Sequence, residues 1–133
     1  MAKLYLANAF SLNMVSNYIE NHGHITLIVD EISLDTLKKL TNDKGYELVN
    51  AIGHEGTAKL VGDLINKELK ANRIEIKMEE SDTIVVVQLL ERLPEGKVLS
   101  HEEIMDYYNK GKVKFYRVRH LGYEDNIDRS AFL

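Results

Sequence analysis

The sequence contains no cysteine and no tryptophan, and it has one proline in 133 residues. The absence of cysteine excludes disulfides, zinc–thiolate sites and thiol nucleophiles. No apolar run approaches the roughly 18 residues that a membrane-spanning helix needs. The N-terminal segment MAKLYLANAF has too short an apolar stretch for a signal peptide. We therefore expect a cytoplasmic protein with no membrane partner.

Basic residues are fewer than acidic ones: the sequence has 17 Lys and Arg against 21 Asp and Glu, which gives a formal net charge of -4. Proteins that bind DNA without regard to sequence rely on a broad basic surface. We expect no stable DNA binding, and an anionic ligand would need a local basic pocket. The chain length is typical of one domain that buries its own core.

Apolar patterning divides this domain into strands and helices. Alternating or β-branched apolar runs predict strands over residues 3–8, 24–30, 45–53, 72–78, 83–90 and 112–120. The segments 72–78 and 83–90, joined by the polar EESD, are expected to form a hairpin.

Serines and glycines mark the expected helix ends. Ser11 could cap a helical turn, and Ser33 opens a segment with leucines at helical spacing. Ser100 and Glu103 form a capping-box pattern, and Gly111 follows as a C-terminal stop signal. Together these elements predict an α/β (α+β) single domain with a mixed five- or six-stranded sheet flanked by about three helices.

The segment NAIGHEGTAKLVGDLI, residues 50–65, places His54 between a predicted strand and a predicted helix. Gly53 and Gly56 remove side chains beside it, and the free N–H groups of a helix N-terminus favour anions. A phosphate docked beside an imidazole is one interpretation. A packed ring that donates to a backbone carbonyl, with glycines that serve only the turn, is the alternative.

Charged side chains follow the longest predicted strand in the segment ERLPEGK. Arg92, Glu95 and Lys97 could fold over an anionic ligand, with the arginine as a two-pronged phosphate donor. A solvated charged turn explains them equally well. Arg73 stands at the start of a predicted strand, where it could reach the same ligand or face water.

Polar residues also gather after the first predicted strand, where α/β sheets often bind ligands. Asn8, Ser11 and Asn13 occupy this segment, although caps and turns account for them too. The HGH motif at 22–24 lacks a neighbouring carboxylate or cysteine cluster, so we interpret it as a loop rather than a metal pair. The arginines and aromatics of 112–120 could stack on bases, but an alternating strand explains them as well.

The segments LANAFSLNM, NAIGHEGTAKLV, NRIEIKM and ERLPEGKVLSHEEI, in this order, resemble the viral ring-nuclease anti-CRISPR family. The resemblance covers residues 1–120, a ring-nuclease-like domain, and leaves 121–133 as a C-terminal extension. It implies a homodimer that binds cyclic tetra-adenylate across its two-fold axis and cleaves it to linear di-adenylate. Type III CRISPR signalling in a prokaryotic host cell would thereby be suppressed, without a metal or other cofactor.

The resemblance also implies roles for individual residues. The catalytic histidine falls on His54, the phosphate-contacting arginine on Arg92 and the assisting glutamate on Glu95. Residues 89–100 correspond to a loop that closes over the ring. Viral relatives tend to have glutamine where this chain has Glu91, and strand alternation should point that carboxylate away from Arg92. The expected substrate-binding residues are Asn8, Ser11, Asn13, Gly53, Arg73, Gln88 and Lys97.

The implied chemistry needs few protein groups. An RNA 2′-hydroxyl in line with its own phosphate requires no external nucleophile, so the protein positions the ring, offsets charge and protonates the departing 5′-oxygen. Histidine is the side chain best suited to that proton transfer near neutral pH. Two alternatives stay open at this point: a non-catalytic protein that sequesters the cyclic nucleotide, and a viral nucleic-acid-binding regulator.

Overall fold

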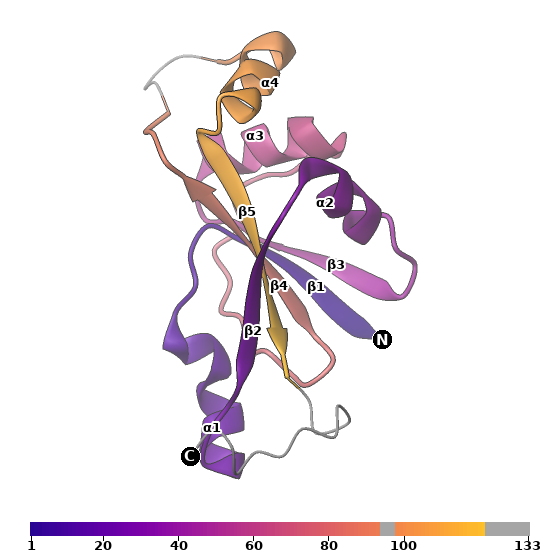
Figure 1. The fold of residues 1–133 in the computed structure, drawn as a ribbon, viewed down its shortest axis with the longest axis vertical. Coiled ribbons are helices and arrows are strands. Elements are labelled where there is room, and N and C mark those ends of the chain that lie inside the picture. Colours follow the sequence, from indigo (N-terminus) through magenta and orange to yellow (C-terminus); the bar gives the residue numbers. More distant parts are fainter. Residues whose placement is uncertain (94–97, 122–133) are drawn as a thin grey trace.

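The computed structural model describes residues 1–93 and 98–121 of the chain. These residues form a single α+β domain with a five-stranded mixed sheet and four α-helices (Figure 1). The expected fold class is confirmed. The elements in chain order are β1 (Ala2–Ala7), the 3-10 helix η1 (Leu12–Val15), α1 (Ser16–His22), β2 (Leu27–Ile32), α2 (Leu34–Thr41), β3 (Tyr46–Ala51), α3 (Glu55–Ile65), β4 (Thr83–Leu89), α4 (His101–Asn109) and β5 (Val113–His120).

The sheet combines a parallel and an antiparallel half. Its strand order is β2-β5-β4-β1-β3. Strand β1 lies between β3 and β4 and runs parallel to both, whereas β5 lies between β4 and β2 and is antiparallel to both. The carboxyl ends of β1, β3 and β4 therefore meet at one edge of the sheet.

Side chains on the two faces of the sheet belong to separate apolar clusters. Alternate residues of β1 show the division, since Leu4 and Leu6 join one cluster and Tyr5 and Ala7 join the other. The first cluster also contains the apolar residues of α2, α3 and α4, and the second contains Val15 of η1. Figure 1 shows α2, α3 and α4 gathered toward one end of the molecule and α1 at the other.

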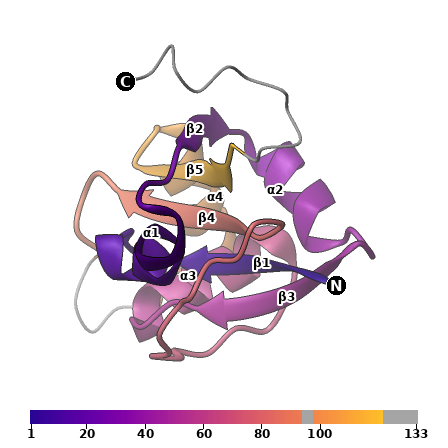
Figure 2. The ribbon, with the colours of Figure 1, turned by 90° about the horizontal axis from the view of Figure 1, so that it is seen from below.

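The segment 72–78 is not a strand, so the predicted hairpin is wrong. Both edges of β4 are already hydrogen-bonded, one to β1 and the other to β5. The segment instead crosses the sheet as an extended chain (Figure 2). Its alternation reflects burial rather than pairing, because Ile76 and Met78 enter the second cluster while Lys77 is exposed.

Most predicted helix ends are confirmed by hydrogen bonds. The Ser33 side chain accepts from the N–H of Thr36, and Ser100 with Glu103 forms a reciprocal capping box. Gly111 follows α4 with a φ of 73°, a left-handed conformation that glycine adopts without strain. Ser11 precedes η1, but its side chain makes no capping bond.

Two carboxylates that the sequence analysis did not single out tie strands together. Asp82, only 5% exposed, accepts from the backbone N–H groups of Lys3 and Glu79, both at 2.9 Å. Asp30 of β2 receives two bonds from the guanidinium of Arg117 on β5, at 3.1 and 2.7 Å. The hydrogen bonds from Arg117 hold the pKa of the Asp30 carboxyl below its usual value.

Candidate functional site

The carboxyl-end edge of the parallel strands gathers several of the predicted site residues. Asn8 follows β1 directly, and His54 follows β3 after a short turn. Gln88 lies near the end of β4, and Arg92 comes just after that strand. Ligands of open α/β sheets bind at this kind of edge. The topology therefore brings together residues that are up to 84 positions apart in the chain, from 8 to 92.

His54 is the residue immediately before α3, and its ring is not part of the core. Its backbone is extended, with φ -114° and ψ 128°, and its side chain makes no capping hydrogen bond. The residue is exposed, and the part of the chain that the structure describes provides no partner for its ring nitrogens. This arrangement excludes the packed-ring alternative, so the imidazole is free to meet a ligand.

A pocket of about 290 Å³ opens beside His54 on the face of the sheet that carries η1. Four of the predicted site residues, Asn8, Gly53, His54 and Arg73, contribute to its wall. The other lining residues are small or apolar: Ala7, Ala9, Met14, Ala51, Ile74 and Ile76. A small, largely apolar pocket with a few convergent polar groups is typical of a ligand site.

Two of the polar groups in this wall are joined through Gly53. The Gly53 N–H donates to Asn8 Oδ1 at 2.8 Å, and Arg73 Nε donates to the Gly53 carbonyl oxygen at 3.1 Å. A Cβ atom on Gly53 would lie 3.1 Å from Arg73 Cγ. Glycine at this position is therefore explained by the close approach of the Arg73 side chain.

The segment after β4 carries Arg92 toward the first turn of α3. A Cβ atom on Gly56 would lie 3.4 Å from Leu93 Cδ1, so residue 93 packs beside that turn. Arg92 itself is exposed, and its guanidinium has no hydrogen-bond or ion-pair partner within residues 1–93 and 98–121. An exposed guanidinium that is unpaired within these residues is available for an anion.

Glu91, the departure from the family pattern, is held away from the ligand edge. Its carboxylate pairs with Lys112 Nζ at 2.8 Å, and its carbonyl oxygen accepts from the hydroxyl of Tyr107. The hydrogen bond to Glu91 raises the pKa of Lys112, and burial raises the pKa of Tyr107. The added negative charge is thus paired with a lysine rather than directed at Arg92.

The remaining predicted residues lie outside this pocket or outside the described residues. Ser11 and Asn13 are exposed around η1, and neither lines the pocket. Gln88 is exposed, and its amide nitrogen lies 3.4 Å from the Leu89 carbonyl oxygen. Glu95 and Lys97 fall in the segment 94–97, and the predicted extension begins at 121, so both predictions lie largely outside the described residues.

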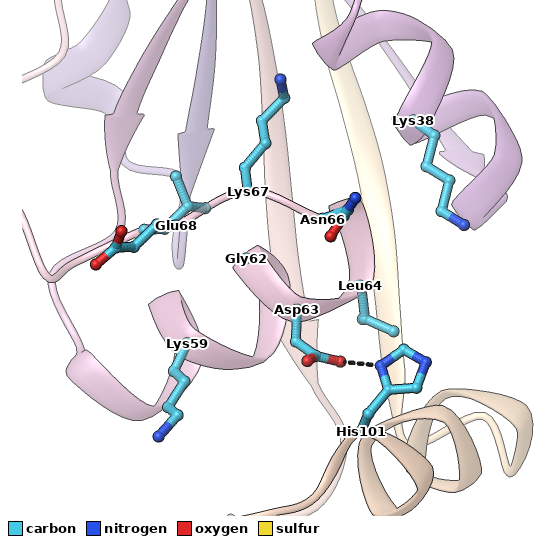
Figure 3. A pocket seen from close by; sticks show the side chains of 10 residues that line it. Lys38, Lys59, Gly62, Asp63, Leu64, Asn66, Lys67, Glu68 and His101 are labelled. Atoms are coloured by element: carbon cyan, nitrogen blue, oxygen red, sulfur yellow. Dashed lines mark hydrogen bonds and ion pairs between the residues drawn. The ribbon is translucent and has the colours of Figure 1, made fainter.

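A larger groove, of about 650 Å³, lies at the opposite end of α3 (Figure 3). Three lysines and two carboxylates are among its lining residues, and His101 Nδ1 contacts Asp63 Oδ2 at 2.6 Å. That contact joins α3 to α4, and sequence spacing gave no signal for it. None of the predicted site residues lines this groove, so its size alone does not make it the site.

Neither a metal centre nor a membrane span emerges from the described residues. Within 1–93 and 98–121, no group of three or more His, Asp or Glu side chains is placed to hold a metal ion. His22 of the HGH motif has its Nδ1 atom 3.0 Å from the Tyr18 carbonyl oxygen. In the same ranges, none of the helices has the length and hydropathy to cross a bilayer.

Several proteins of archaeal viruses are similar to this chain in sequence or in structure. ORF116 of Acidianus filamentous virus 1 is 40% identical over 116 residues, which cover 86% of this chain and 93% of that protein. Protein 26 of a Sulfolobus islandicus filamentous virus is 32% identical over 76 residues, covering 57% of this chain and 63% of its own length. The structure of B116 from Sulfolobus turreted icosahedral virus matches with a TM-score of 0.75 and 39% identity, covering 90% of this chain and all of B116.

A sequence model described as STIV B116-like matches residues 4–116, a range that contains all five strands and all four helices except the ends of β1 and β5. The same range includes every residue that lines the pocket beside His54. This chain belongs to the STIV B116-like family of archaeal viral proteins.

Proposed function

We propose that this protein is a metal-independent ring nuclease that cleaves cyclic tetra-adenylate to linear di-adenylate and so suppresses type III CRISPR signalling. The observation that carries the proposal is the state of His54. Its ring is exposed, lacks a partner in the described residues, and stands at the N-terminus of an 11-residue helix beside a pocket. Free N–H groups and the helix dipole attract phosphate to this position, where an imidazolium can donate a proton.

The reaction requires one bond to form and one to break at each scissile phosphate. The 2′-oxygen attacks its own phosphorus, its proton passes to water, and a 2′,3′-cyclic phosphate forms. The bond from phosphorus to the 5′-oxygen breaks, and the departing oxygen takes a proton from the His54 imidazolium. Two such cleavages on opposite sides of the ring release two linear di-adenylates.

Pocket size supports a ligand shared between two copies of the chain. Sites that enclose a whole drug-sized ligand measure about 300–1,000 Å³. The pocket beside His54, at about 290 Å³, is large enough for part of a cyclic tetranucleotide only. A two-fold homodimer would present two such pockets and two histidines to the ring, matching its symmetry.

Arg92 has the second role in the proposal. It is exposed and unpaired within the described residues, and its neighbour Leu93 packs beside the first turn of α3. From there its guanidinium can bind a phosphate before and during bond cleavage. Glu95, as the assisting glutamate, stays a prediction of the family resemblance.

Single-turnover cleavage and equilibrium binding of labelled cyclic tetra-adenylate test the proposal. We expect His54→Ala to slow cleavage by about 10²- to 10⁴-fold while affinity changes far less. Arg92→Ala should weaken affinity and rate together, since its phosphate contact exists before the transition state. Lys59→Ala is the matched control, because it removes one exposed positive charge from α3 and Lys59 does not line the pocket beside His54.

Three outcomes would contradict parts of this scheme. Tight binding without linear products would make the protein a sequestering module instead of an enzyme. Loss of activity in excess EDTA, with recovery on adding magnesium or manganese, would replace the metal-free chemistry. A near wild-type rate in His54→Ala would remove the general-acid role.

A further inference from the structure

The two peptide groups that meet at Gly53, just before His54, are each hydrogen-bonded by a side chain from a distant segment. Asn8 Oδ1 accepts the Gly53 N–H at 2.8 Å, and Arg73 Nε donates to the Gly53 carbonyl oxygen at 3.1 Å. Asn8 comes from the end of β1, whereas Arg73 comes from the chain between α3 and β4. Asn8 therefore fixes the peptide group that joins Ile52 to Gly53, and Arg73 fixes the one that joins Gly53 to His54.

The segment that carries Arg73 is itself hydrogen-bonded to the strand-to-helix turn 50–55. The N–H of Asn72 donates to the Ile52 carbonyl oxygen at 2.7 Å, and the side chain of Asn50 donates to the Lys70 carbonyl oxygen at 2.6 Å. Two further bonds run from the N–H of Ala71 to the Glu55 carboxylate at 3.1 Å and from Asn72 Nδ2 to the Asn50 carbonyl oxygen at 2.8 Å. Residues 70–73 thus act as a strap across the strand-to-helix turn 50–55. The predicted strand 72–78 begins in this strap.

Gly53 has no other need to be glycine in this conformation. Its φ is not in the left-handed region, which holds only Gly23, Gly111 and Asn66 among the described residues. The Cβ of a larger residue would lie 3.1 Å from Arg73 Cγ, which is closer than most carbon contacts. The sequence therefore leaves space at Gly53 for the stem of Arg73.

We propose that Asn8 and Arg73 are positioning residues, which hold the two peptide groups on either side of Gly53 Cα so that the His54 ring points at the scissile phosphate. The proposal rests on the proposed function for the chemistry that His54 performs. An exposed ring without a partner of its own in the described residues owes its direction to its backbone. A misplacement of about 1 Å costs roughly 100-fold in rate, so the orientation of these two peptide groups has a large effect on catalysis.

The same two side chains keep unused donors for a ligand. The Nδ2 atom of Asn8 and the terminal nitrogens of Arg73 have no partner in residues 1–93 and 98–121. Both side chains line the pocket with His54. A phosphate bound to these donors would immobilise the side chains that fix the turn, so substrate binding would steady the general acid.

Substitutions at Asn8 separate positioning from ligand contact. Asn8→Asp keeps an oxygen that accepts the Gly53 N–H, but it loses Nδ2 and adds a negative charge. We expect it to raise Kd while it retains most of the rate at saturating ligand. Asn8→Ala loses the acceptor, and we expect its rate at saturation to fall about 10- to 100-fold. Asn109→Ala, at the exposed end of α4, is the matched control.

Amide hydrogen exchange of Gly53 gives a readout that needs no activity. The Gly53 N–H should exchange slowly in the wild type and in Asn8→Asp, and faster in Asn8→Ala. Gly53→Ala is the second variant, because its Cβ displaces Arg73 without removing any hydrogen-bonding group. We expect Gly53→Ala to show a similar fall in rate at saturating ligand. It therefore tests the positioning role even if Asn8→Ala does not fold.

Failure of this proposal differs from failure of the proposed function. A wild-type protein that cleaves no ring overturns the ring-nuclease function and with it the role assigned to Asn8 and Arg73. Cleavage by the wild type with equal saturated rates in Asn8→Ala and Gly53→Ala overturns the positioning role alone. Equal rate losses in Asn8→Asp and Asn8→Ala would likewise overturn it, since only the second variant loses the bond to Gly53.

Discussion

Replacing Asp82 should weaken the whole domain, although this residue lies far from the candidate site. Its carboxylate is 5% exposed and accepts the backbone N–H groups of Lys3 at the start of β1 and Glu79 in the preceding turn. These bonds help to set the register of β1 against β4. A slip of one residue would turn every β1 side chain to the other face and move Asn8 away from Gly53.

The size of the effect follows from these two bonds. A hydrogen bond to a charged group contributes about 1.5–3 kcal/mol, and an unsatisfied buried donor adds a desolvation cost. Since both bonds share one carboxylate and are not additive, we expect Asp82→Ala to lower the free energy of unfolding by about 3 kcal/mol. Asp82→Asn retains one acceptor and should lose roughly half of that. For a domain of this size the larger loss corresponds to a Tm lower by about 10 °C.

Urea unfolding followed by circular dichroism measures this loss as a change in midpoint at constant slope. Asp106→Ala is the matched control, because that carboxylate is 59% exposed and pairs with Lys110, the C-cap residue four positions later. Such surface pairs contribute about 0.3–0.5 kcal/mol. If Asp82→Ala and Asp106→Ala lose the same small amount, the buried carboxylate does not anchor β1 in solution and the reasoning is refuted.

Two further predictions concern the sheet and a helix end. The pKa of Asp30 is lowered in the folded protein by its bonds from Arg117, so the stabilisation by this pair should be complete above the unfolded pKa of about 3.9 and disappear as pH falls through the folded value. Unfolding of wild type and Asp30→Asn between pH 7 and pH 2 checks this, and a stability difference that does not shrink in acid would contradict it. Gly62→Ala should destabilise by about 1–3 kcal/mol, because its Cβ would lie 2.5 Å from the Lys67 carbonyl oxygen. Gly56→Ala on the same helix has no such clash and should be neutral or stabilising in thermal melts, so equal losses in the two variants would refute the argument.

Local sequence signals predicted the helix ends well. The hydroxyl of Ser33, the Ser100–Glu103 box and Gly111 each act over three or four residues, so their geometry is encoded in short segments. Alternation in 72–78 failed as a hairpin signal because β4, the expected partner, is paired with β1 on one side and β5 on the other, and only the rest of the fold determines this. The sequence also implied five or six strands, and the lost sixth is this same segment.

The residues of the candidate site could be predicted from the sequence, but the long-range contacts that bring them together could not. Polar residues after strands, and a histidine before a helix, are visible in the sequence, and Asn8, Gly53, His54 and Arg73 do line one pocket. The bond from Asn8 to Gly53 spans 45 positions, and no local pattern encodes it. The pairing of Glu91 with Lys112 likewise depends on β5 lying beside β4.

The strand order of the sheet has a consequence for how the chain folds during synthesis. Only β4 and β5 are neighbours both in the sequence and in the sheet. The other pairs join strands that are far apart in the chain, such as β1 with β4 and β2 with β5. Contacts between distant segments lose the entropy of closing large loops before any contact energy is gained, so folding is slow and strongly cooperative. On the ribosome, the first half of the chain would emerge with β2 unpaired and with β1 able to pair only with β3. We expect arrest-peptide force measurements to report no stable sheet until His120 has left the exit tunnel, and then a single late folding event.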